Sequence, residues 1–183
     1  MMTELTVFAC GTGRAIEGPI TAETAIRAAL APLGVRFERW PTRPLAEGAS
    51  PEDVFVAYAA EIGRLKREGG YQSADVVRLT PQAPDLEALR AKFLDEHAHA
   101  EDEVRFFVEG SGAFYLRTEE KVFQLVCVAG DLISVPAGQR HWFDMGARPH
   151  FAAVRLFTNP DGWVARFTGD PIARRIPLYE RAA

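Results

Sequence analysis

Apolar residues recur at helical spacing in the first half of the chain and alternate in short runs after residue 103. The helical spacing predicts three amphipathic helices, from Thr21 to Gly34, from Ser50 to Gly70, and over residues 86–94. The second helix has the clearest start, because Ser50 can cap it and Pro51 fits its first turn. Residues 35–40 and 74–79 alternate as strands do, and we expect them to pair with a sheet.

After residue 103 the short apolar runs are separated by turn residues, which is typical of a β-sandwich or barrel. We therefore expect a mainly β fold with a helical N-terminal part (α+β). No repeat, linker or low-complexity tract divides the chain, so a single domain is expected over residues 1–183. Within it we expect a helix-rich lead-in (1–95), a β-barrel core (96–160) and a C-terminal segment (161–183). The predicted strands cover residues 103–108, 112–116, 122–128, 132–135, 141–144 and 151–157.

Composition and charge exclude several classes of function. Of the 183 residues, 48% are hydrophobic and 25% are charged, as in an ordinary globular protein. The formal net charge of -4 argues against a nucleic-acid partner, because phosphate binding needs clustered Lys and Arg. With no long apolar run and no secretion signal at the start, we expect a cytoplasmic protein without a membrane segment. Cys10 and Cys127 are too isolated to suggest a disulfide framework or a thiolate metal site.

Three of the four histidines occur in a pattern that predicts a metal site. His97 and His99 are two residues apart, so their rings lie on the same face of an extended strand. Glu103 follows a short polar link and can open the next strand, facing the same interior. His141 follows about forty residues later, after a Pro-Ala-Gly turn. A single histidine on a strand is more often structural, but three at these spacings favour a metal.

This spacing resembles the two sequence motifs of the cupin superfamily, whose members are double-stranded β-helix (jelly-roll) barrels holding a metal with three His and one Glu. The usual glycine before the first histidine is absent, and Met145 stands in place of the usual Asn. Three imidazoles and one carboxylate suit Fe(II), Ni(II) or Mn(II) better than structural zinc. In an octahedron they leave two positions for a substrate.

Strand alternation nominates residues around this site. Arg105 shares the inward face of Glu103, where a guanidinium needs an anion, either a substrate or a neighbouring carboxylate such as Glu101 or Asp102. Phe107 and Phe143 share the faces of Glu103 and His141 and could form apolar walls, or belong only to the core. Phe93 and Trp163 are further candidates for the wall, and Arg155 is either a second anion partner or part of a buried ion pair.

Seven segments together resemble the bacterial acireductone dioxygenase family, over residues 34–170. They are 34–40 (GVRFERW), 92–97 (KFLDEH), 101–110 (EDEVRFFVEG), 131–136 (DLISVP), 141–146 (HWFDMG), 159–163 (NPDGW) and 167–170 (FTGD). The resemblance implies a monomeric enzyme of methionine salvage that oxidises 1,2-dihydroxy-3-keto-5-methylthiopentene with O2. It implies Fe(II) or Ni(II) held by His97, His99, Glu103 and His141, with Arg105 stabilising the enolate charge.

Two alternatives remain open from the sequence. The chain could be another cupin enzyme, such as a sugar-phosphate isomerase or a different dioxygenase, although a phosphosugar would require more basic groups than Arg105 and Arg155. It could also be a non-catalytic cupin that binds a small molecule. The intact ligand set favours an enzyme, and oxygen uptake with an acireductone separates these possibilities.

Overall fold

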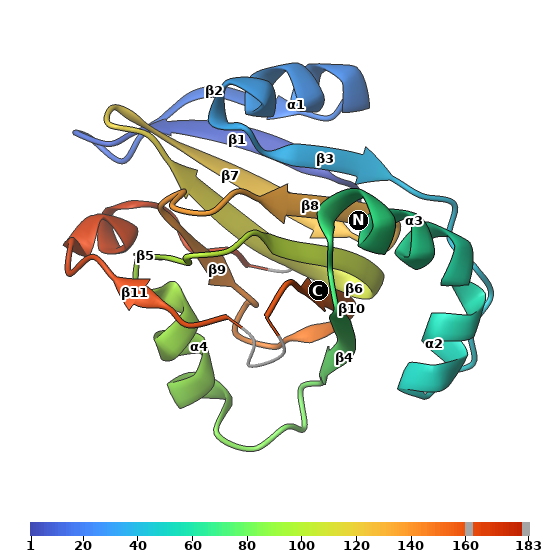
Figure 1. The fold of residues 1–183 in the computed structure, drawn as a ribbon. Coiled ribbons are helices and arrows are strands. Elements are labelled where there is room, and N and C mark those ends of the chain that lie inside the picture. Colours follow the sequence, from blue (N-terminus) through green and yellow to red (C-terminus); the bar gives the residue numbers. More distant parts are fainter. Residues whose placement is uncertain (160–162, 181–183) are drawn as a thin grey trace.

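The computed structural model describes residues 1–159 and 163–180, and it is mainly β with few helices (Figure 1). Within these residues, eleven strands join in one sheet whose pairings form no closed circuit. The mainly β fold class is thus confirmed, with an open sheet in place of a closed barrel. The strands are β1 (Glu4–Ala9), β2 (Ala15–Ile20), β3 (Arg36–Arg39), β4 (Ser73–Leu79), β5 (His97–Ala98), β6 (Glu103–Arg117), β7 (Lys121–Val128), β8 (Asp131–Val135), β9 (His141–Asp144), β10 (His150–Phe157) and β11 (Arg166–Phe167).

Strand β6 is the centre of the sheet, and it is longer than predicted. The sequence suggests two strands, 103–108 and 112–116, whereas the structure has one continuous strand of 15 residues. Its first part lies between β8 and β10, and its second part lies between β7 and β9. Gly110 continues the strand with a φ of +66°, which a glycine adopts without strain. A Cβ there would lie 1.7 Å from the carbonyl oxygen of His150.

A bulge precedes Gly110 and reverses which residues of β6 face inward. Phe107 and Glu109 pair with the adjacent residues Ala153 and Ala152, so Val108 is an extra residue on β6. Because side chains alternate along a strand, one extra residue moves all later ones to the opposite face. Odd positions face the central core before the bulge, and even positions such as Phe114 face it afterwards.

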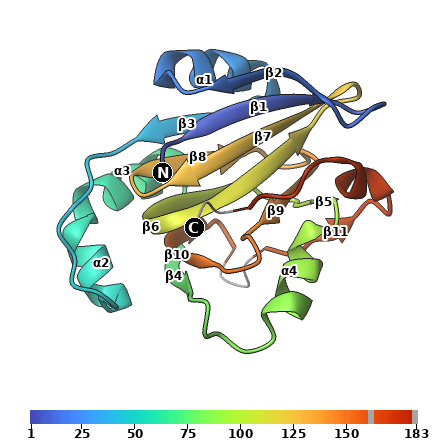
Figure 2. The same ribbon diagram turned by 180° about the vertical axis from the view of Figure 1, so that it is seen from behind.

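Three apolar layers hold the strands and helices together. The central layer includes Leu5 on β1, Phe114 on β6 and Phe143 on β9. A second layer is covered by α2 (Pro51–Ala57) and α3 (Ala59–Gly69), and a third by the 3-10 helix Pro171–Arg175 and its neighbours. Figure 2 shows α2 and α3 together on one side, with α4 (Leu86–Leu94) beside β9 on the other.

The predicted helices are present, with one break that the pattern did not indicate. The first is α1 (Glu23–Leu30), extended by the 3-10 turn Ala31–Leu33 and ended by Gly34 in the left-handed region. The second starts at a capping box between Ser50 and Asp53, as predicted, but is divided into α2 and α3 at Tyr58. None of the helices in the described ranges is long and apolar enough to cross a membrane.

Strands from the predicted lead-in are integral to the sheet. Strands β1 and β2 were not predicted from the sequence, yet β1 pairs with β7 over six residues and β2 pairs with β1. The expected strands 35–40 and 74–79 are observed as β3 and β4, which pair with β8 and β10. Of the expected C-terminal segment 161–183, residues 161–162 and 181–183 lie outside the described ranges.

Candidate metal centre

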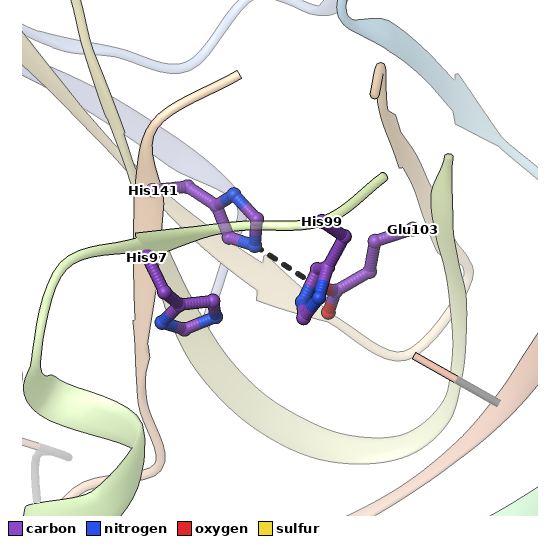
Figure 3. Close-up of side chains that lie close together, drawn as sticks. All are labelled: His97, His99, Glu103 and His141. Atoms are coloured by element: carbon purple, nitrogen blue, oxygen red, sulfur yellow. Dashed lines mark hydrogen bonds and ion pairs between the residues drawn. The ribbon is translucent and has the colours of Figure 1, made fainter. Parts of the chain in front are cut away.

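The four predicted ligand side chains converge in the structure (Figure 3). His97 lies on β5, Glu103 is the first residue of β6, and His141 is the first residue of β9. His99 directly follows β5. The short pairing between β5 and β9 places His97 opposite His141. One donor atom from each of the four residues lies within 4.8 Å of the others, and all four side chains are buried.

Each imidazole is oriented by a backbone carbonyl. Because a carbonyl oxygen only accepts, each Nδ1 must carry the proton, and a neutral ring then presents the lone pair of Nε2. Such a partner on the second nitrogen is the usual support of a metal-binding histidine. The three Nδ1 atoms donate to Asp95 O for His97 (2.7 Å), Val164 O for His99 (3.0 Å) and Gln139 O for His141 (2.7 Å).

The carboxylate of Glu103 fits a bound cation. Its Oε2 atom lies 3.0 Å from Nε2 of both His99 and His141. Two neutral imidazole lone pairs and a carboxylate oxygen repel one another unless a proton or a metal lies between them. The Oε1 atom lies 2.8 Å from Arg105 Nε, but neither atom has a hydrogen-bond partner of acceptable geometry in the described structure. These donors therefore fit a divalent metal, which would satisfy them together.

The electrostatics of the site favour the deprotonated forms of His97 and Glu103, which a metal requires. Burial, reinforced by the nearby His141, lowers the pKa of His97 to about 4. Burial raises the pKa of Glu103, but the Arg105 charge and the two histidine contacts outweigh it and hold that pKa well below the usual range. Burial also lowers the pKa of His99, but the hydrogen bond that its protonated ring donates to Glu103 and the attraction of the Glu103 charge outweigh this effect, so the net shift of the His99 pKa is upward in the absence of a metal.

Arg105 is a buried cation beside the ligands. It is 7% exposed, and burial lowers its pKa despite the attraction of Glu103. Its guanidinium carbon lies 4.6 Å from the ring centroid of Phe143, 5.3 Å from that of Phe114 and 5.7 Å from that of Trp163. Cation–π contacts of this kind gain strength in a desolvated site.

The alternative carboxylate partners suggested for Arg105 are engaged elsewhere. Glu101 accepts hydrogen bonds from Thr158 and the backbone of Asn159, and Asp102 accepts one from the backbone of Ala137. The ion-pair partner of Arg105 is thus the candidate metal ligand Glu103. A guanidinium so close to the ligands can contact whatever occupies the adjacent space.

A cavity of about 430 Å³ opens next to the four ligands and Arg105. Its volume lies within the range of sites for small molecules, and apolar groups make up most of its lining. Four of the expected neighbours, Phe93, Phe143, Arg155 and Trp163, line it. Phe107 does not, because it is fully buried in the central core. The lining is completed by four residues that were not predicted from the sequence, Lys92, Val164, Ala165 and Phe167.

Arg155 forms an ion pair, but the pair is partly exposed and not buried as one alternative expected, with 31% of the Arg155 side chain and 46% of the Asp75 side chain accessible. Its guanidinium donates to both carboxylate oxygens of Asp75 on the neighbouring strand β4, at 2.8 and 2.5 Å. It also lies over the rings of Phe157 and Trp163. Its charge is largely neutralised by Asp75, so it supports the Trp163 wall of the cavity more directly than it attracts an anion.

Most of the cavity lining that was not predicted from the sequence belongs to residues 163–168, which we call the covering segment. Trp163 donates its indole N–H to Asp102 O, and Val164 O accepts from His99. At the other end, β11 pairs with β5, and Thr168 bonds to the buried carboxylate of Glu96, which also binds Arg117. These tertiary contacts have no periodic signal in the sequence. Residues 160–162 of the resembling segment 159–163 lie outside the described ranges.

The fold and the donor set define a small β-sheet protein of the cupin type with a three-histidine, one-carboxylate metal site. A family model described as "ARD/ARD' family" matches residues 43–165, which is more than half of the chain. The chain therefore belongs to the ARD/ARD' family.

Curated relatives extend this match over nearly the whole chain. An acireductone dioxygenase of Pseudomonas paraeruginosa is 62% identical over 162 residues, covering 88% of this chain and 90% of the relative. One from Marinobacter nauticus is 52% identical over 182 residues, covering 100% and 98%. A solved structure, described as acireductone dioxygenase from Bacillus anthracis with cadmium ion in active center, has a TM-score of 0.77 and 29% identity. It covers 91% of this chain and 98% of the solved chain, which confirms the fold class.

Proposed function

We propose that this protein is an acireductone dioxygenase, a metal-dependent enzyme that cleaves 1,2-dihydroxy-3-keto-5-methylthiopentene with O2. The observation that carries the proposal is the buried set of three carbonyl-anchored imidazoles and one carboxylate, open to an apolar cavity. The names of the curated relatives agree with this activity. The reaction belongs to methionine salvage, where it would consume a reactive enediol.

We propose that His97, His99, Glu103 and His141 hold one Fe(II) or Ni(II) ion per chain. These residues would hold the ion beside the cavity, and the ion would supply Lewis-acid chemistry to the bound substrate. In the family, Fe(II) gives 2-keto-4-methylthiobutyrate and formate, whereas Ni(II) gives methylthiopropionate, formate and carbon monoxide. Both ions suit this donor set, and the order of affinities favours Ni(II).

Arg105 would stabilise the negative charge of the ionised enediol. It is held by Glu103 on one side and by the Phe143, Phe114 and Trp163 rings around it, so its position is fixed before substrate binds. A fixed cation in a site with little water stabilises developing charge at no cost of reorganisation. In this role Arg105, and not only the metal ion, would take part in catalysis.

The apolar side of the cavity would hold the methylthio tail. Phe93 and Phe143 face each other edge to face, with ring centroids 6.5 Å apart, and Trp163 lines the same space. Sulfur makes modestly favourable contacts with aromatic rings. Arg155 would keep Trp163 in place. Phe107 is not part of the cavity lining and would support the Phe143 ring from the central core, with ring centroids 6.4 Å apart.

The protein would act on its small-molecule substrate and O2 as a cytoplasmic monomer, without nucleic acid or membrane partners. The net charge of -4 supports the absence of a nucleic-acid partner. Size-exclusion chromatography with light scattering tests the monomer. A mass of twice 20.2 kDa would contradict it.

Reconstitution tests the proposed activity. The purified protein would be stripped of metal with a chelator, reloaded separately with Fe(II) or Ni(II) under anaerobic conditions, and analysed for metal content. We expect one ion per chain, O2 uptake with the acireductone in both forms, and carbon monoxide from the Ni(II) form alone. A protein that holds one ion per chain and takes up no O2 with this substrate would contradict the proposal and favour a binding cupin.

A further inference from the structure

Gly112 lies on β6 directly behind the ring of Phe143. Its backbone is outside the left-handed region, so nothing in its conformation demands glycine. A Cβ built at this position would lie 2.4 Å from Cζ and 2.7 Å from Cε2 of Phe143. The ring tip would have to move by about 1 Å to reach an ordinary contact of 3.4 Å. The absence of a side chain at Gly112 therefore allows the observed position of Phe143.

The surroundings of Phe143 determine where its ring could move. It is 2% exposed, and its ring centroid lies 5.0 Å from that of Phe114 and 5.7 Å from that of Phe151. The guanidinium of Arg105 lies 4.6 Å from the same centroid. Closely packed neighbours do not yield easily. Phe143 lines the cavity, which is open space next to its ring, so we expect a ring pushed away from position 112 to move into that cavity.

We propose that Gly112 is a positioning residue that sets the depth of the cavity and so determines which substrate tails fit. It acts through Phe143 and does not touch the substrate itself. This inference rests on the proposed function, because it assumes that the cavity holds the tail of an acireductone. One methylene of fit in an apolar pocket changes kcat/KM by roughly 10–200-fold, so a ring shift of this size is measurable.

The test compares two substrates in matched variants. The substrates are the methylthio acireductone and the same acireductone without its methylthio group. Gly112→Ala pushes the ring away from position 112, and the double variant Gly112→Ala with Phe143→Leu removes the atoms that the new methyl would meet. Phe143→Leu alone is the reference for the double variant, because Phe143 itself lines the cavity. Gly11→Ala is the control, because a Cβ at Gly11 meets nothing within 4 Å and its φ is not positive. Metal content and thermal midpoint are measured for each protein, and kcat and KM are measured separately for each substrate.

We expect Gly112→Ala to lower kcat/KM for the methylthio substrate about tenfold or more relative to the truncated one, mainly through KM. Shifting Arg105 alone would slow both substrates equally, so the ratio isolates the tail. The double variant should match Phe143→Leu alone in this ratio to within a few-fold, because the new methyl then meets no ring atoms, and Gly11→Ala should keep the wild-type ratio.

Each outcome decides between the two proposals. An unchanged substrate ratio in Gly112→Ala would overturn the role of Gly112, and so would a double variant whose ratio differs from that of Phe143→Leu as much as Gly112→Ala differs from wild type. If Gly112→Ala does not fold, the double variant must fold and match the ratio of Phe143→Leu, and its failure would also overturn the role. A wild-type protein that turns over neither substrate would instead contradict the dioxygenase function.

Discussion

The two parts of strand β6 line the same central core with opposite chemistry. Before Gly110, its inward residues include the charged pair Glu103 and Arg105. After Gly110, they are Gly112, Phe114 and Leu116, all apolar. Glu103 and Arg105 line the cavity, where the histidines and a bound substrate can compensate their charges. Gly112, Phe114 and Leu116 do not line it. A strand interior thus carries ionic groups only where partners for them exist.

The two parts also depend on each other. The apolar part supplies the Phe114 ring that contacts the Arg105 guanidinium, and the Gly112 gap that admits Phe143. The bulge at Val108 lets one strand supply both sets, because it changes the inward positions from odd to even numbers. Substitutions within each part, at their junction and at a separate charged cluster test this dependence.

Glu103→Gln should abolish the function of the charged part. An uncharged amide between His99 and His141 cannot replace an anionic ligand. Even an outer partner of a metal ligand is worth about 10–100-fold, so we expect more than a 100-fold loss of O2 uptake. Metal analysis after dialysis should show far less than one ion per chain. Glu109→Gln, on the same strand but paired with Arg78 and His150, is the control and should retain both properties.

Arg105→Met should separate catalysis from metal binding. It keeps the length of the side chain and removes the cation that would face the enediolate. We expect one ion per chain and a kcat lower by about 100–1000-fold, comparable to the loss of one oxyanion donor. Arg155→Met, which breaks the Asp75 pair at the cavity edge, should have a smaller effect. Equal turnover in Arg105→Met and wild type would refute the charge role.

Gly110→Ala tests the junction between the two parts. The new methyl would be strained at a φ of +66° and would overlap the backbone of His150. We expect a loss of at least about 2 kcal/mol in the free energy of unfolding, measured by urea titration. Gly70→Ala is a matched control, because its φ of +68° is similar and a Cβ there meets nothing within 4 Å. A loss in Gly110→Ala no larger than in Gly70→Ala would show that the β10 contact is unimportant.

Glu38→Gln tests the ion pairs that Glu38 on β3 forms with Arg36 and Arg64, for comparison with the charged pair of β6. Burial raises the pKa of Glu38, but hydrogen bonds from Trp40, Arg64 and Arg36 outweigh it and lower the pKa to about 2. A carboxyl whose folded pKa is lowered stabilises the protein above its ordinary pKa, and this contribution is lost as pH falls from about 4.5 towards 2.

We expect wild type to exceed Glu38→Gln in unfolding free energy by about 1 kcal/mol at pH 7, after allowance for solvent screening. The difference should shrink as the pH falls below 4.5, without any effect on metal content. Chemical unfolding at several pH values measures it. A difference that stays constant down to pH 2 would contradict the assigned ion pairs.

Local periodicity explains what the sequence could predict about the fold. The capping box at Ser50 and the glycine that ends α1 are local features, so the helix boundaries there could be predicted. The break at Tyr58 has no proline or glycine to indicate it. Strand β2 is almost entirely exposed and lacks apolar alternation, so its pairing with β1 could not be read from the pattern.

The candidate site could be predicted only where side-chain alternation is uninterrupted. Glu103 and Arg105 precede the bulge, and both lie beside the cavity as their parity indicates. Phe107 has the same parity but lies deeper, in the central core, because distance along the strand also matters. Val164 and Phe167 reach the cavity through tertiary contacts of the covering segment, which no spacing rule describes.

The three imidazoles are oriented by backbone oxygens, which determines which changes of sequence the site can tolerate. Asp95, Gln139 and Val164 contribute main-chain oxygens, so exchanging any of these side chains leaves the acceptor atom in place. Point substitutions at these positions should therefore be tolerated by the ligand geometry far better than an insertion or deletion of one residue. The orientation of the imidazole rings therefore depends on the backbone conformation and is insensitive to which side chains these three positions carry.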